Sequence, residues 1–257
     1  MIPYIENPTL TLGSYTLESF WVLVGIAIIV EFQIVMRRAP RYGISALETS
    51  TLLGWAIGLG ILGAHVFDIF VYFPERLRED PWVLLRFWGS LSSFGGMLGG
   101  LLGLLAVMQI RGMPGADQLR FVDCLLFALP FTLAIGRLGC GLQHDHLGIE
   151  STHWLAVRFP DGPRFDLGLL EFFYTSLMAG LFVWLDRRRW PAGFFLGAFF
   201  ALYGPVRFAL DALRVGDVRY AGWTPGQYLS IAATLLGLTV LAWVLRSRVS
   251  DDEAPAA

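Results

Sequence analysis

Charge, cysteine and lysine are scarce in this sequence, and these scarcities limit what the protein can be. Charged residues make up 16% of the 257 residues, which is low for a soluble domain. The two cysteines, Cys124 and Cys140, cannot provide a disulfide framework. All 19 basic residues are arginine and the formal net charge is −2, so we expect no nucleic-acid partner. The sequence also contains no phosphate-binding loop, nucleophile elbow or zinc-protease motif.

Apolar residues are abundant instead. They make up 55% of the chain, and the mean hydropathy is +0.59. Apolar runs of about 20 residues, long enough to cross a bilayer, recur along the sequence. They predict an all-α, polytopic membrane protein with one transmembrane domain over residues 1–250 and a disordered tail over 251–257. The seven predicted spans lie near residues 19–36, 50–73, 90–110, 121–138, 167–185, 192–210 and 226–245.

The arginines predict how the chain crosses the membrane, because short cytoplasmic loops retain positive charge. One set of connections holds ten arginines, and the opposite side carries fewer, spread over longer loops. We therefore expect the N-terminus outside and the C-terminus, with its tail, in the cytoplasm. The ten arginines are Arg37, Arg38, Arg41, Arg111, Arg120, Arg187, Arg188, Arg189, Arg246 and Arg248.

The segment Gly136–Gly148, with the sequence GRLGCGLQHDHLG, is the most unusual in the chain. It directly follows the apolar run Phe121–Ile135 and falls at the outer face in the predicted topology. Ionisable groups at the end of a membrane span are costly and usually functional. We therefore expect an outer-face loop region near residues 139–166 that carries the chemistry of the protein.

Titratable side chains cluster at the end of that segment. His144, Asp145 and His146 could take or give a proton near neutral pH. An alternative is that the two histidines only hydrogen-bond the loop. A metal site that adds His65 is a further alternative, but the spacing is not specific and we expect no metal.

A second polar cluster lies near residue 210. Tyr203, Arg207, Asp211 and Arg214 are spaced to share one helical face. Arg207 and Arg137 are predicted at the same outer level of the membrane. Two guanidinium groups bind a phosphate well, and the phosphate available there belongs to a phospholipid. The alternative is a structural Arg207–Asp211 ion pair.

A glycine cluster at the outer end of the third span allows two interpretations. Gly95, Gly96, Gly99, Gly100 and Gly103 follow a serine-rich segment. Backbone N–H groups near a helix start bind anions. Glycines at this spacing also let two helices pack closely, and both interpretations can hold together.

Taken together, these segments resemble the prolipoprotein diacylglyceryl transferase family, bacterial inner-membrane enzymes of lipoprotein maturation. The resemblance covers nearly the whole chain. Gly136-Arg137-Leu138-Gly139 with Gly148 resembles the family signature. Further matching segments are Ser92-Ser93-Phe94-Gly95-Gly96, Tyr203-x3-Arg207-x3-Asp211-x2-Arg214-x2-Asp217 and Gly226-Gln227.

The resemblance implies an activity and a set of site residues. The family moves the diacylglyceryl group of phosphatidylglycerol to the lipobox cysteine thiol of a prolipoprotein signal peptide. The resemblance implies no cofactor and does not predict an oligomeric state. The resemblance together with the titratable cluster gives Arg137, Arg207, His144, Asp145 and Asp211 as the expected catalytic residues, of which His144 comes from the cluster alone. The lipid-binding residues would be Arg137, Gly95, Gly96, Gly139, Gly148, Tyr203 and Arg214.

The sequence departs from the family at several positions. Phe94 replaces the family histidine that is the usual candidate base, and Cys140 and Gln143 replace two asparagines of the signature. Asp145 replaces a glutamate. We therefore hypothesise that His144, His146 or Asp145 supplies the base. The alternative function is a divergent paralogue that binds phospholipid headgroups without turnover or uses another acceptor.

Overall fold

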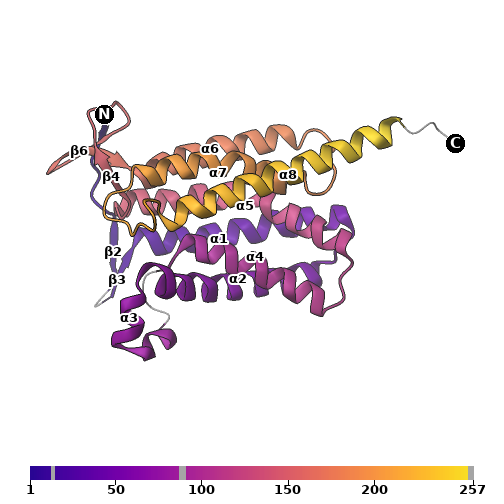
Figure 1. Ribbon diagram of the computed structural model, residues 1–257, viewed down its shortest axis with the longest axis horizontal. Coiled ribbons are helices and arrows are strands. Elements are labelled where there is room, and N and C mark those ends of the chain that lie inside the picture. Colours follow the sequence, from indigo (N-terminus) through magenta and orange to yellow (C-terminus); the bar gives the residue numbers. More distant parts are fainter. Residues whose placement is uncertain (13–14, 87–90, 254–257) are drawn as a thin grey trace. The chain divides into compact units, whose positions relative to one another are not determined.

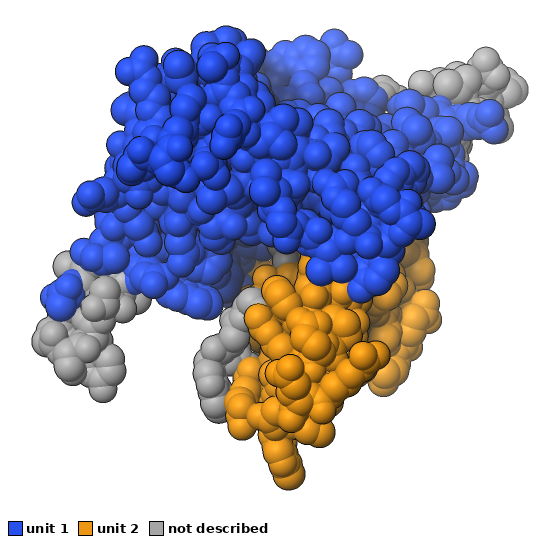
Figure 2. Space-filling model, turned by 60° about the vertical axis from the view of Figure 1, so that its left-hand side comes forward, with its two compact units in different colours: residues 1–34, 123–257 blue, residues 35–122 orange. Residues whose placement is uncertain are grey.

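The computed structural model describes residues 1–12, 15–86 and 91–253. The chain divides into two compact units, which Figure 2 shows in different colours. Unit 1 comprises residues 1–34 and 123–257, and unit 2 comprises residues 35–122. We describe each unit by itself.

Helices dominate both units (Figure 1). Among the described residues, six helices are long and apolar enough to cross a membrane, and α4 is a shorter apolar helix, so the predicted polytopic α-helical fold is confirmed. Short helical segments occupy Ala39–Tyr42, Asp68–Tyr72 and Pro81–Leu85. The helices are α1 (Ser19–Arg38), α2 (Ala46–Phe67), α3 (Pro74–Glu79), α4 (Ser93–Ile110), α5 (Gly115–Gln143), α6 (Leu167–Leu185), α7 (Phe194–Ala212) and α8 (Pro225–Glu253).

Short strands gather at one end of the helices of unit 1 (Figure 1). Four form a sheet in the order β1-β5-β6-β4, in which β1 runs parallel to β5 and the other pairs are antiparallel. The remaining two form an antiparallel hairpin. The strands are β1 (Ile2–Pro3), β2 (Thr9–Leu12), β3 (Tyr15–Glu18), β4 (Leu147–Glu150), β5 (Val157–Phe159) and β6 (Gly162–Asp166).

The segment predicted as an outer loop therefore has regular structure. Residues 139–143 continue α5, and most of 147–166 belongs to the sheet. Residues 160–161 connect β5 and β6 in an antiparallel hairpin. At the other end of the chain α8 extends to Glu253, so part of the predicted tail is helical. Residues 254–257 lie outside the described residues.

Glycines bring α2 and α4 into close contact in unit 2. A Cβ atom on Gly63 would lie 2.6 Å from the carbonyl oxygen of Gly95 and 2.6 Å from the Cα of Gly99. Around Gly54 and Gly58, which also lie on α2, no described atom comes within 4 Å of such a Cβ. The close-packing interpretation of the glycine cluster therefore holds, with Gly63 as the partner on α2.

Close helix contacts also position the polar residues of unit 1. A Cβ on Gly168, at the start of α6, would lie 2.8 Å from the backbone nitrogen of Gly141 on α5. On α7, a Cβ at Gly204 would lie 2.8 Å from the carbonyl oxygen of Ser230 on α8. Because backbones touch at these points, the side chains one turn away are held at fixed separations.

Candidate active site

A buried carboxylate on α6 joins residues from two other helices. Glu171 is 1% exposed, and its Oε1 lies 3.0 Å from the Nε of Arg137 on α5. Its Oε2 accepts a hydrogen bond of 3.0 Å from the Nη1 of Arg207 on α7. The hydroxyl of Tyr203 donates to Oε1. Charge-assisted bonds of this kind are what make a buried ion group tolerable.

The Arg207 guanidinium is held from a second side as well. Its Nη2 lies 2.8 Å from the Oδ1 of Asp211, one turn further along α7, and the hydroxyl of Thr224 donates to the other oxygen of that carboxylate. Thr224 also caps the start of α8, because its hydroxyl accepts a 3.1 Å hydrogen bond from the backbone N–H of Gln227. The orientation of Arg207 is thus fixed by α6, by its own helix and by the start of α8.

Arg214 extends this charged group toward the surface. The sequence predicted it on the helical face of Arg207, but α7 ends at Ala212. The backbone of Arg214 instead pairs with that of Gly148 in β4 through a single antiparallel β-bridge. Its side chain is 24% exposed, and its Nη1 lies 3.3 Å from the Oδ2 of Asp217. Its Nη2 lies 3.3 Å from the Nδ1 of His146.

His146 lies among ionisable groups at the end of α5. A ring nitrogen of His146, the thiol of Cys140 and a carboxylate oxygen of Asp145 all lie within 4.8 Å of one another. The Nη1 of Arg137 is 4.0 Å from the Cys140 sulfur. Burial, together with the positive charges of the nearby arginines, holds the pKa of His146 well below its usual range. Its imidazole is therefore neutral at neutral pH.

Asp145 titrates in the same surroundings. Burial raises the pKa of Asp145, and the charge of Arg137 opposes that rise. Its Oδ1 lies 3.6 Å from the Nδ1 of His146. Asp145 and His146 thus form a carboxylate–imidazole pair, an arrangement typical of acid–base sites.

His144 has a different environment. Its Nδ1 lies 2.6 Å from the Oδ2 of Asp166, and its Nε2 lies 2.9 Å from the carbonyl oxygen of Ile5. Tyr4 stacks on the ring at 4.8 Å. Both ring nitrogens are therefore engaged by protein acceptors.

The contacts of His144 also have a structural consequence. Asp166 caps α6 by accepting from the Leu169 amide at 3.0 Å, so His144 links the end of α5, the start of α6 and the N-terminal segment. Burial raises the pKa of Asp166, and the hydrogen bond to His144 opposes that rise. A catalytic role for His144 stays a prediction, while its geometry is that of a structural link.

The predicted lipid-binding glycines lie at packed or helix-capping positions. A Cβ on Gly139 would lie 3.3 Å from the Cα of Phe20, and one on Gly148 would lie 3.0 Å from the side chain of Leu167. Gly95 and Gly96 belong to unit 2, where the Gly95 amide donates to the Ser92 hydroxyl at 3.2 Å. The structure thus gives each of the four a packing or capping environment.

Glu171 and Cys140 are the site residues whose importance the sequence did not reveal. The available signal for Glu171 was a carboxylate inside an apolar span, which needs a buried partner. The signal for Cys140 was its place three residues after Arg137 in the glycine-rich segment. The signal for Glu171 does not identify its partners, because Arg137 and Arg207 lie on other helices.

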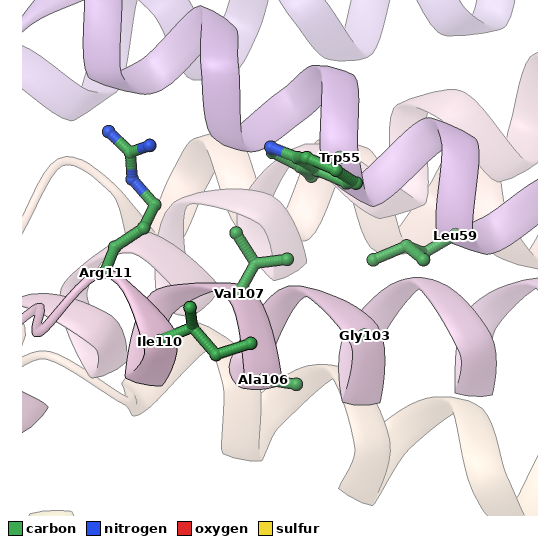
Figure 3. A pocket seen from close by; sticks show the side chains of 7 residues that line it. All are labelled: Trp55, Leu59, Gly103, Ala106, Val107, Ile110 and Arg111. Carbon is green, nitrogen blue, oxygen red and sulfur yellow. The ribbon is translucent and has the colours of Figure 1, made fainter.

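A groove in unit 2 is a separate feature. It has a volume of about 430 Å³ and lies between α2 and α4 (Figure 3). Trp55 and Leu59 line one side, and residues of α4 line the other. Arg111 at its end is the one charged residue among those that line it, so the groove offers no group that could take a proton.

Comparison with known proteins places this arrangement in a family. The family described as prolipoprotein diacylglyceryl transferase matches residues 8–243. Three similar proteins are each named phosphatidylglycerol–prolipoprotein diacylglyceryl transferase. The one from Actinobacillus pleuropneumoniae serotype 3 is 29% identical over 94% of both chains. The one from Pseudomonas aeruginosa PAO1 is 26% identical over 98% of both, and the one from Paramagnetospirillum magneticum is 31% identical over 80% of this chain and 81% of its own.

Proposed function

This chain belongs to the prolipoprotein diacylglyceryl transferase family, and we propose that it transfers the diacylglyceryl group of phosphatidylglycerol to the lipobox cysteine thiol of prolipoproteins. The thiolate sulfur attacks the glycerol carbon that bears the phosphate. The carbon–oxygen bond to phosphate breaks, and glycerol phosphate leaves with the bonding electrons. Such a reaction needs cationic groups for the leaving phosphate and a base for the thiol.

The buried arginine cluster is the observation that carries this proposal. Arg137 and Arg207 are fixed on opposite oxygens of one carboxylate, and Arg214 lies nearer the surface. Carboxylates balance the three guanidiniums, so the cluster is held in place before any lipid arrives. Preorganised charge stabilises a transition state without reorganisation during the reaction.

The remaining predicted residues take supporting roles in this proposal. Tyr203 and Asp211 orient the two sides of the cluster through Glu171 and Arg207. Gly139 and Gly148 allow the close approach of their neighbours. Gly95 and Gly96 remain candidate contacts for the lipid, and Asp145 remains a candidate for proton transfer.

The setting follows from the topology predicted by the arginines. The protein is a multi-pass membrane protein. We place it in the bacterial inner membrane, with the N-terminus and the arginine cluster at the outer face and the C-terminus in the cytoplasm. Phosphatidylglycerol in the outer leaflet then reaches the cluster directly.

A second candidate function is phospholipid binding without turnover, which Phe94 in place of the family histidine favours. Complementation of a strain depleted of its own transferase distinguishes the two functions. We expect the chain to restore growth and lipoprotein maturation, and we expect Arg137→Lys to fail because lysine lacks the planar fork that binds phosphate. Arg120→Lys, at an exposed arginine paired with Asp117, is the matched control. A membrane-inserted wild-type chain that gives no mature lipoprotein would contradict the proposal.

A further inference from the structure

We propose that His146 is the base that deprotonates the acceptor thiol, and that Arg214 holds His146 in an inactive tautomer until the lipid phosphate binds Arg214. This inference rests on the proposed transferase function and adds an order of events to it. Lipid binding comes first, and thiol activation follows.

The contact between Arg214 and His146 sets the starting state. A guanidinium has only donors, so the 3.3 Å contact between Nη2 of Arg214 and Nδ1 of His146 makes Nδ1 the acceptor. A neutral ring then carries its hydrogen on Nε2. In this tautomer the one lone pair of the ring is occupied by Arg214, and His146 cannot take a proton.

Asp145 is placed to stabilise the other tautomer. Its Oδ1 lies 3.6 Å from Nδ1 of His146, on the same nitrogen that Arg214 occupies. When Arg214 turns to a phosphate oxygen, Nδ1 becomes available to donate to Asp145. The hydrogen then resides on Nδ1, and Nε2 gains the lone pair that a base requires, as in other carboxylate–histidine pairs.

Arg214 is suited to this exchange because it is the least restrained arginine of the cluster. Its side chain is 24% exposed, whereas the side chains of Arg137 and Arg207 are 5% and 4% exposed. Its contacts with Asp217 and His146 are both 3.3 Å long, longer than a strong charge-assisted bond. A phosphate dianion or diester offers it shorter bonds.

The groups around His146 keep its imidazole neutral, which is the form that can accept a proton. Arg137 and Cys140 face it from α5, Arg207 from α7 and Arg214 from the segment after α7, while Asp145 precedes it in the chain. Burial, together with these positive charges, holds its pKa well below the usual range. Removing Arg214 to the phosphate, which carries negative charge, raises that pKa at the stage when His146 must accept a proton.

The proton and electrons balance in this scheme. The thiol proton moves to Nε2 of His146 as the sulfur forms its bond to the glycerol carbon. The phosphate oxygen keeps the electrons of the broken carbon–oxygen bond, so glycerol phosphate leaves as the anion. The imidazolium, paired with Asp145, then gives its proton to the departing phosphate or to water.

The tautomer of His146 can be measured directly. The full chain is labelled with ¹⁵N-histidine and placed in nanodiscs of phosphatidylcholine alone or with phosphatidylglycerol, and the His146 signal is assigned by its loss in His146→Gln. We expect the Nε2–H form without phosphatidylglycerol and the Nδ1–H form with it. In Arg214→Gln we expect the Nδ1–H form in both. One tautomer in both lipids would overturn the inference.

Kinetics provide an independent test. We expect His146→Gln to lower kcat by about 10²–10⁴ and to remove the acidic limb of the pH–rate profile, with little change in KM for phosphatidylglycerol. His153→Gln, at an exposed loop histidine, is the matched control. Cys140→Ser retaining the acidic limb excludes that thiol as the base. An active wild type with an equally active His146→Gln would overturn this inference alone, whereas an inactive wild type would overturn the proposed function as well.

Discussion

Glu171 is the residue that holds the arginine cluster together. It accepts from Arg137, Arg207 and Tyr203, which come from two other helices. A carboxylate at this depth is tolerated only because its oxygens are fully engaged. The sequence offers a lone acid in an apolar run but gives no means of pairing it with arginines 34 residues before it and 36 residues after it.

Removing the charge of Glu171 is expected to destabilise the arginine cluster. Glu171→Gln keeps the shape of the side chain but leaves two buried guanidiniums without their shared counter-charge. We expect a loss of stability on the order of 3–5 kcal/mol together with a loss of transferase activity, measured by thermal unfolding in detergent and by activity at low temperature. Glu150→Gln, at an exposed position of β4, should change neither. A normally stable Glu171→Gln protein would contradict the account of the cluster.

The pKa of His146 leads to a second prediction, on pH and stability. Its pKa is lowered in the folded state, so below about pH 6.5 the unfolded chain binds more protons than the folded one. Stability is therefore full above that pH and falls on acidification, by up to about 1.4 kcal/mol per pH unit. Unfolding temperatures measured from pH 7.5 to 5 should fall less steeply for His146→Gln than for the wild type. Parallel curves would contradict this assignment.

At the scale of elements, the sequence predicted the helices better than their ends. Among the described residues, the apolar runs predict the six helices long enough to cross a membrane and the shorter apolar helix α4, because burial in lipid imposes a length and a composition. The glycine-rich end of α5 reads as loop, since glycine weakens an isolated helix. In the structure α5 continues to Gln143 because Gly141 packs against Gly168 on α6, a tertiary contact that no local pattern contains.

That helix contact gives a prediction with a matched pair of variants. A Cβ at Gly168 would meet backbone atoms of Cys140 and Gly141 at 2.8 to 3.0 Å, whereas one at Gly136 would have no described atom within 4 Å. We expect Gly168→Ala to lower the unfolding temperature and to reduce activity by displacing Glu171. Gly136→Ala, in the interior of α5, should be neutral or slightly stabilising. Equal behaviour of the two variants would rule out the close contact.

The candidate site was predictable in part for the same reason. Helical spacing on α7 correctly groups Tyr203, Arg207 and Asp211, since i and i+4 positions share a face. The same spacing fails for Arg214, because α7 ends at Ala212 and the chain turns to meet β4. The partners of His144, at the N-terminus and at the α6 cap, lie far away in sequence and could not be read from it.

At the scale of the whole molecule, the orientation in the membrane is open to direct measurement. The arginine distribution predicts the segment around Thr152 outside and the α6–α7 connection inside. Thr152→Cys, at an exposed site, should react in intact cells with a membrane-impermeant thiol reagent. Arg188→Cys should react only after the cells are opened. The native cysteines are buried, so labelling of the wild-type chain gives the background signal. Labelling of position 188 in intact cells would reverse the topology.

We propose that the buried arginine cluster makes this chain a diacylglyceryl transferase. The most direct test is mass spectrometry of a lipobox peptide incubated with the purified chain in vesicles that contain phosphatidylglycerol. We predict a peptide whose cysteine carries a thioether-linked diacylglyceryl group, glycerol phosphate in equal amount, and neither product with Arg137→Lys. An unmodified peptide with the wild-type chain, or undiminished product with Arg137→Lys, would contradict the account.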